Sequence, residues 1–186
     1  MSQENLELVR SIFAAWARCQ VKTAPRPVLP PNGLPRRGHK PMTEESPTPG
    51  PVELARRAIE AADRGDLDAL ARTFAPDAVW DWNRLGGLGT FEGHAAIRSV
   101  LGDWHANYDE LEITLGEILD FGNGVVFFVI MQKGRPVGSS GEVQIRFATV
   151  NLYVEGLCAR ATQYLDINEA RAAAERLAEE RAQADA

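Results

Sequence analysis

The sequence predicts an α+β fold, in which helices cover one face of a curved, antiparallel sheet. Two observations carry this prediction. Apolar residues recur at helical spacing in the first part of the folded region, and strand-like segments follow one another from residue 111 onward. Glycine- and asparagine-rich turn signals, such as Gly122-Asn123-Gly124, separate these later segments, as expected for hairpins that join antiparallel strands.

Three helices are expected before the sheet. The first covers about 52–64 and ends at Gly65, a residue suited to a helix C-terminus. Asp66 is placed to cap the second helix, which we expect to run as far as Phe74. The third presents one apolar face made of Ile97, Val100, Leu101, Trp104 and Tyr108.

The strands follow from alternation and from apolar runs. A short strand is predicted over 78–84, and the glycine-rich loop 86–89 then turns the chain toward the third helix. The main sheet is predicted from segments at about 111–121, 124–133, 142–154 and 157–166.

The ends of the chain have a different composition from its middle. Residues 1–20 carry apolar residues at helical spacing and are predicted to form an extra amphipathic helix. Nine of the eleven prolines fall within the next segment, 21–51, which is predicted to be a disordered linker. The folded domain is assigned to 52–168, and the alanine-rich tail 169–186 is expected to be a solvated helix.

Charge and composition exclude several classes of function. With 20 basic and 26 acidic residues the formal net charge is −6, so a nucleic-acid partner is not expected. No apolar run approaches the roughly 20 residues of a membrane-spanning helix, and no secretory signal is seen, so we expect a cytoplasmic protein without membrane contact. Cys19, Cys158 and the three scattered histidines lack the spacing of metal ligands, and no metal or cofactor is expected.

Three short runs resemble a known superfamily. They are Ala62-Asp63-Arg64-Gly65-Asp66-Leu67-Asp68-Ala69-Leu70, Phe74-Ala75-Pro76-Asp77-Ala78-Val79-Trp80 and Gly93-His94-Ala95-Ala96-Ile97-Arg98. Together with Phe147-Ala148-Thr149-Val150 and Tyr164-Leu165-Asp166 they resemble the nuclear transport factor 2-like superfamily, and most closely its SnoaL-like branch of polyketide cyclases. The resemblance covers 52–168.

The resemblance implies a cone, a bent cystatin-like sheet wrapped around three helices and open at one end to an apolar pocket for a flat, hydrophobic molecule. Comparison with ketosteroid isomerases, which belong to the same superfamily, implies that the face of strand 142–154 that contains Ala148 looks inward. Val143, Ile145 and Phe147 would then face outward, where a homodimer formed sheet against sheet would cover them.

The same comparison bears on catalysis. The base, the tyrosine and the protonated acid of the isomerases fall at Trp82, Ala58 and Ala148, so all three groups are missing. The acid/base aspartate of the cyclases matches Asp166, which is therefore the candidate catalytic residue. Asp166 is equally suited to cap the last helix, and capping is the interpretation that we favour.

Candidate ligand-binding residues are aromatic and polar. The aromatic and apolar set is Trp80, Trp82, Leu101, Trp104 and Tyr108, which could form a wall for a planar ligand or could simply be core. The polar set is Glu142, Gln144 and Arg146, which the inward face would carry near the mouth of the cone. Arg146 either pairs with Glu142 or binds an enolate or carboxylate. His105 is expected to be solvated rather than a general base.

The leading hypothesis is a SnoaL-like domain that binds a small, hydrophobic, oxygenated molecule. A carboxylate-dependent enzyme of the cyclase, isomerase or hydrolase type is the alternative. A third hypothesis is a protein-interaction module that uses the first helix and the linker.

Overall fold

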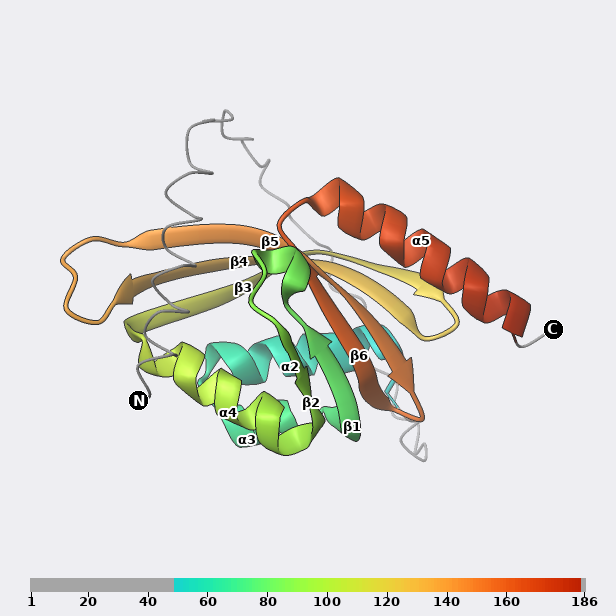
Figure 1. Ribbon diagram of the computed structural model, residues 1–186, viewed down its shortest axis with the longest axis horizontal. Helices are drawn as coiled ribbons and strands as arrows, with labels where there is room; N and C mark the ends of the chain where they lie inside the picture. Colours follow the sequence, from blue (N-terminus) through green and yellow to red (C-terminus); the bar gives the residue numbers. More distant parts are fainter. Residues whose placement is uncertain (1–48, 185–186) are drawn as a thin grey trace, which may run out of the picture.

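The structure, a computed structural model, describes residues 49–184 of the chain (Figure 1). The predicted extra helix at 1–20 and nearly all of the predicted linker at 21–51 lie outside these residues, and so does the hypothesis of an interaction module that uses them. The folded unit begins with α2 at Pro51, close to the predicted start of the domain.

One six-stranded sheet forms the centre of the fold, in the order β2-β1-β6-β5-β4-β3. The strands are β1 Phe74–Asp81, β2 Thr90–Glu92, β3 Tyr108–Gly122, β4 Val125–Pro136, β5 Val143–Val154 and β6 Leu157–Tyr164. All neighbouring pairs are antiparallel except β1 and β6, which run parallel, so the sheet is mixed rather than purely antiparallel.

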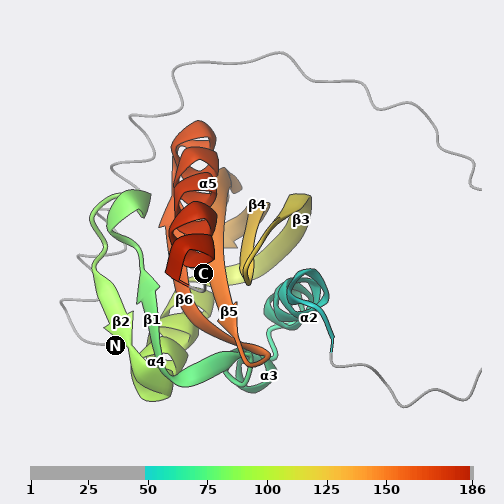
Figure 2. The same cartoon turned by 90° about the vertical axis from the view of Figure 1, so that its right-hand side faces the viewer.

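Helices lie on both faces of this sheet. Its concave face is covered by α2 Pro51–Asp63, α3 Leu67–Ala71 and α4 Gly93–Ala106, whereas α5 Ile167–Ala184 crosses the convex face. Figure 1 shows α2, α3 and α4 below the sheet and α5 above it, and Figure 2 shows the same arrangement from the side. The predicted α+β fold, with a curved sheet around three helices, is confirmed.

Local sequence signals set the first helix boundaries. Gly65 follows α2 with a positive φ of 67°, and the Asp66 carboxylate accepts a hydrogen bond of 2.9 Å from the Ala69 amide at the start of α3. The prediction that this second helix reaches Phe74 is wrong. The Thr73 carbonyl instead accepts a hydrogen bond from the Cys158 amide of β6, and Phe74 opens β1.

The convex face carries the clearest difference from the predicted tail. Ala170 and Ala174 of α5 are fully buried and Ala178 is nearly so, which makes the prediction of a solvated helix wrong. Small side chains one turn apart let the helix lie close to Ala148 and Val150 of β5. These three alanines therefore form the buried part of a packing face, which Ile167 and Leu177 of the same helix extend.

The predicted faces of β5 are inverted. Phe147 belongs to the core under the concave face, whereas Ala148 packs below α5. Because side chains alternate along a strand, an alignment that is wrong by one residue turns every side chain to the opposite face. Glu142, Gln144 and Arg146 are exposed, and Glu142 pairs with Lys133 at 3.0 Å rather than with Arg146.

The apolar residues expected to form a sheet-to-sheet homodimer are not on the outer face. Ile145 and Phe147, two of the residues expected on the outer face, lie in the concave core, and α5 covers part of the convex face. The homodimer stays a prediction, to be tested by the mass of the protein in solution. Within residues 49–184 no helix is long and apolar enough to cross a bilayer.

Candidate functional site

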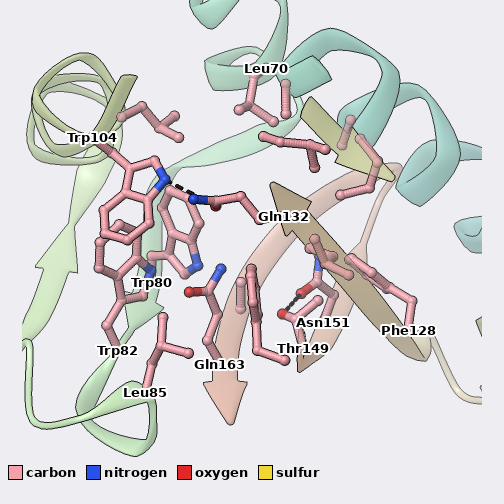
Figure 3. A pocket seen from close by; sticks show the side chains of 18 of the residues that line it. Leu70, Trp80, Trp82, Leu85, Trp104, Phe128, Gln132, Thr149, Asn151 and Gln163 are labelled. Carbon is pink, nitrogen blue, oxygen red and sulfur yellow. Dashed lines mark hydrogen bonds between the residues drawn. The ribbon is translucent and has the colours of Figure 1, made fainter. Parts of the chain in front are cut away.

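A cavity of about 90 Å³ lies between the concave face of the sheet and the helices that cover it (Figure 3). The helices α2, α3 and α4 and the strands β1, β3, β4, β5 and β6 all contribute to it. Its lining consists of Ala58, Ile59, Ala62, Leu70, Phe74, Trp80, Trp82, Leu85, Leu101, Trp104, His105, Ile113, Phe128, Ile130, Gln132, Phe147, Thr149, Asn151, Ala161 and Gln163. The cavity is thus enclosed mainly by aromatic and aliphatic side chains, with a few amides and one hydroxyl.

Three tryptophans form one wall of the cavity. Trp80 comes from β1, Trp82 stands just before the short helix η1 Asn83–Leu85, and Trp104 comes from α4. The ring centroid of Trp82 lies 5.0 Å from that of Trp80 and 5.5 Å from that of Trp104, in both cases edge to face. This arrangement is the one that aromatic quadrupoles favour, so the wall is well packed.

Polar side chains lie on the strands that form the floor. Gln132 of β4, Thr149 and Asn151 of β5, and Gln163 of β6 are all buried. The Trp104 indole donates to the Gln132 carbonyl oxygen at 3.1 Å, and the Thr149 hydroxyl donates to the Asn151 carbonyl oxygen at 3.0 Å, as drawn in Figure 3. Some of the polar capacity of the floor is therefore satisfied within the protein.

Two polar groups at the cavity lack such partners. Trp82 is only 4% exposed, and its indole nitrogen is buried without a hydrogen-bond acceptor in the described structure. Gln163 forms no side-chain hydrogen bond within residues 49–184, and Figure 3 shows its amide directed toward Trp80 and Trp82. The Gln132 amide nitrogen is similarly buried, but it lies beside the Tyr108 hydroxyl. Trp82 is thus the clearest unsatisfied donor.

The lining carries no charge at neutral pH. In the part of the chain that the structure describes, no Asp or Glu side chain lines the cavity. His105 does line it, and burial lowers the pKa of its imidazole from the ordinary value of 6.5, which keeps the ring neutral at pH 7. The prediction of a solvated His105 is therefore wrong, because the ring is half-buried against the cavity.

The aromatic part of the predicted site is brought together by the fold. Trp80, Trp82, Leu101 and Trp104 all line the cavity. Tyr108 does not, since it lies behind Trp104 with 5.8 Å between their ring centroids, and burial raises the pKa of Tyr108 to about 12. The ligand-binding role of these residues stays a prediction.

The polar part of the predicted site lies elsewhere. None of Glu142, Gln144 and Arg146 lines the cavity, because the predicted faces of β5 are inverted. Of the positions that match isomerase groups, Trp82 and Ala58 line the cavity, whereas Ala148 is on the opposite face.

Asp166 has the capping role that the sequence favoured. One oxygen of its carboxylate accepts hydrogen bonds from the Asn168 amide at 2.8 Å and from the Glu169 amide at 3.1 Å, at the start of α5. The side chain is exposed and is not part of the cavity lining. The capping interpretation is confirmed, and the carboxylate is not in a position to act on a molecule in the cavity.

The sequence interpretation missed the polar floor. Thr149 and Asn151 are separated by one residue in an otherwise apolar strand, and Gln132 and Gln163 occur in neighbouring strands. Polar residues that recur at every second position of a buried strand are the signal that could have identified them. Using that signal requires the correct face of β5, which the alignment had inverted.

The sheet, the three concave helices and the enclosed cavity define an α+β domain of the nuclear transport factor 2-like type. A model of the SnoaL-like domain family matches residues 55–161, more than half of the chain, and the chain therefore belongs to the SnoaL-like domain family. None of the curated proteins matches the chain.

Solved structures agree on the fold. A nuclear transport factor 2-like protein of unknown function from Burkholderia pseudomallei is 18% identical, with 64% of this chain and 92% of that chain covered and a TM-score of 0.54. A protein with a ketosteroid isomerase-like fold from Catenulispora acidiphila, in complex with trimethylamine, is 17% identical, with 60% and 84% covered and a TM-score of 0.55. A putative SnoaL-like polyketide cyclase from Shewanella denitrificans is 15% identical, with 68% and 96% covered and a TM-score of 0.53.

Proposed function

We propose that the concave cavity binds a small, uncharged, largely apolar molecule that carries an oxygen acceptor, such as a carbonyl or ether oxygen. The observation that carries this proposal is the buried Trp82 indole nitrogen, which has no acceptor in the described structure. A buried donor without a partner costs about 1–3 kcal/mol, and a ligand oxygen would relieve that cost. Gln163, whose amide is also without a partner, lies in the same lining.

The absence of charge in the lining favours a neutral ligand. A charged group that enters an apolar cavity loses its hydration and needs a compensating charge, which the described lining does not offer. The apolar side chains that make up most of the lining would instead gain from contact with a hydrocarbon ring or chain.

The volume of the cavity limits the size of the ligand. An engineered cavity of about 150 Å³ accommodates benzene, whereas this cavity measures about 90 Å³. A molecule of few heavy atoms is therefore the best match. A larger ring would have to displace a side chain at the edge, and Trp104 and His105, which are only partly buried, are the candidates for such movement.

The lining supports ligand binding better than catalysis by a carboxylate. The alternative of a carboxylate-dependent enzyme depended on Asp166, which caps α5 outside the cavity. Within residues 49–184 no carboxylate lines the cavity to remove a proton from a bound molecule.

The test uses two ligands of the same shape. Cyclopentanone has a carbonyl oxygen, and methylenecyclopentane has a CH₂ group in its place. Titrations of the full chain, followed through the indole N–H signals in nuclear magnetic resonance spectra, should show that cyclopentanone binds about tenfold more tightly, because only its oxygen can accept from Trp82. Trp82→Phe should remove this preference, since phenylalanine keeps an aromatic ring but has no donor.

Trp80→Phe is the matched control. Trp80 is a tryptophan of the same wall, so its replacement alters the cavity comparably and leaves the Trp82 donor in place. The control variant should keep the preference for cyclopentanone. Equal affinity of the wild-type protein for both ligands, or an equal loss of both in Trp82→Phe, would contradict the proposal.

A further inference from the structure

We propose that a second site, on the convex side of the sheet, binds a small organic monoanion with a carboxylate head and an apolar tail. The site is the cleft between α5 and the sheet, and it is independent of the concave cavity. Its lining consists of Asp81, Arg84, Val150, Leu152, Arg160, Thr162, Tyr164, Ala173, Arg176, Leu177 and Glu180. At about 370 Å³ this cleft is larger than the concave cavity.

Arginines from three separate elements line this cleft. Arg84 comes from η1, Arg160 from β6 and Arg176 from α5. Arg84 forms an ion pair with Glu169, but the side chains of Arg160 and Arg176 have no hydrogen bond or ion pair to any residue in the range 49–184. Two arginines without a hydrogen bond or ion pair in the described structure therefore line one hollow, which suits a carboxylate because arginine binds it through two parallel hydrogen bonds.

Hydroxyl groups from β6 add further donors to the cleft. Tyr164 and Thr162 line it from the strand between β1 and β5. Burial raises the pKa of the Tyr164 phenol; Arg84 and Arg176 lower it, and Glu169 and Asp81 raise it, so charged groups of both signs lie close to the phenol oxygen. The phenol stays protonated at neutral pH and can donate to an anion held by the arginines.

The charge of the lining argues for a single negative charge on the ligand. Arg84 is already paired with Glu169, so Arg160 and Arg176 are the two arginines left to bind an anion, and the carboxylates of Asp81 and Glu180 in the same lining disfavour a second negative charge. The Asp81 carboxylate already accepts hydrogen bonds from the amide and the side chain of Asn83, at 2.9 and 2.8 Å. A dianion such as phosphate would be less well compensated than a carboxylate.

The apolar part of the lining argues for a tail. Val150 and Leu152 of β5 and Ala173 and Leu177 of α5 line the same cleft as the arginines. Contact with a short hydrocarbon chain would remove these side chains and the ligand from water. The site therefore combines arginines that can bind a carboxylate with an apolar surface for a hydrocarbon tail.

The wall that α5 provides is held in place on the sheet. Arg171 pairs with Glu117 of β3 at 2.8 Å, and its guanidinium lies 4.9 Å above the ring of Phe127. At the other end of the helix, the Asn123 amide donates to the Ala178 carbonyl at 3.0 Å. Because α5 is attached both to β3 and to the turn between β3 and β4, the cleft does not depend on a single contact.

The test is a titration of the full chain with hexanoate, hexanamide, acetate and inorganic phosphate, followed through backbone amide signals. Hexanoate should shift the signals of Tyr164 and Arg176 and bind about tenfold more tightly than hexanamide, which has the tail without the charge. Acetate, which has the charge without the tail, should bind about fivefold more weakly than hexanoate. Arg160→Gln and Arg176→Gln should each weaken hexanoate binding about fivefold.

Arg56→Gln is the control, because Arg56 is an exposed arginine of α2 that does not line the cleft. This variant should bind hexanoate like the wild-type protein. The proposal would be overturned by equal affinity for hexanoate and hexanamide, by binding of phosphate alone, or by hexanoate shifts confined to the indole signals of the concave cavity. An equal loss in Arg56→Gln would also overturn it, since the effect would then be one of net charge.

Discussion

The two faces of β5 show how differently one strand can be used. On the concave side, Phe147, Thr149 and Asn151 face a hollow with a buried donor that has no partner. On the convex side, Ala148 and Val150 are packed against the alanine stripe of α5. The concave face encloses a cavity, whereas the part of the convex face beneath α5 is packed against that helix, with a cleft beside it. A single step along the strand thus separates a binding surface from a packing surface.

The concave cavity and the convex cleft also differ in the charge of their linings. The concave cavity has an uncharged lining, whereas the convex cleft has a rim of arginines. The two hollows are therefore expected to discriminate between a neutral and an anionic molecule of similar size. Substitutions on either side of the sheet test this contrast, and the largest effect is expected where packing is tightest.

The largest effect is expected from Ala174→Glu. Ala174 is fully buried between α5 and the sheet, so a glutamate there must either bury its charge or lift the helix from the sheet. The free energy of unfolding should fall by about 3 kcal/mol. Urea unfolding followed by circular dichroism measures this loss.

Ala182→Glu is the control for that experiment, because Ala182 belongs to the same helix but is exposed. It should change the free energy of unfolding by less than about 0.5 kcal/mol. If Ala174→Glu were equally harmless, α5 would contribute little to the stability of the fold. The mass of the Ala174→Glu variant in solution should also be compared with that of the wild-type protein, because a loosened α5 would expose the apolar convex face and so alter the predicted homodimer.

A smaller effect is expected from enlarging one alanine on each face. Ala148→Leu places three more carbon atoms beneath α5, where Ala148 is fully buried, and should reduce the free energy of unfolding by about 2 kcal/mol through overpacking. Ala58→Leu places the same atoms in the lining of the concave cavity, which has space for part of them. It should change stability by less than about 1 kcal/mol.

The same pair of variants also separates stability from binding. Ala58→Leu should weaken cyclopentanone binding severely because it occupies the cavity, whereas Ala148→Leu should leave the affinity of the remaining folded protein nearly unchanged. Similar losses of stability in both variants would mean that the concave layer is packed as tightly as the convex one, and the contrast between the two faces would not hold.

Much of the fold could be predicted from the sequence because local signals determine it. Gly65 and Asp66 set the boundary between α2 and α3, and apolar periodicity identified α4 and the four long strands. The tryptophan wall followed from the spacing of Trp80 and Trp82 within one strand segment. These features depend on neighbours in the chain, so a single sequence contains the necessary information.

The remaining features depend on contacts between distant segments. The α5 helix resembles a solvated helix until the sheet beneath it is known, since its fully buried positions are all alanines and its large residues Ile167 and Leu177 are only partly buried. The inward face of β5 depends on register, and an error of one residue exchanged Arg146 for Phe147 in the predicted lining. The predicted helix at α3 was too long, because the hydrogen bond between Thr73 and β6, which marks the start of the strand, cannot be predicted from helical periodicity.

The smallest predicted effect concerns pH and is confined to the concave side. Burial lowers the pKa of His105 in the folded protein below its ordinary value of 6.5, so the unfolded chain binds a proton more readily. The contribution of His105 to stability is therefore fully present above about pH 6.5 and is lost as the pH falls toward the folded pKa.

His105→Gln should remove this part of the pH dependence, because glutamine does not titrate in this range. Urea unfolding of both proteins at several pH values between about 5 and 8 measures the difference. The variant should lose less stability than the wild-type protein on acidification, while the two curves run parallel above about pH 7. A wild-type protein that gains stability relative to the variant as the pH falls would mean that the ring is better solvated, or better paired, when it is charged, and the cavity could then hold an anion after all.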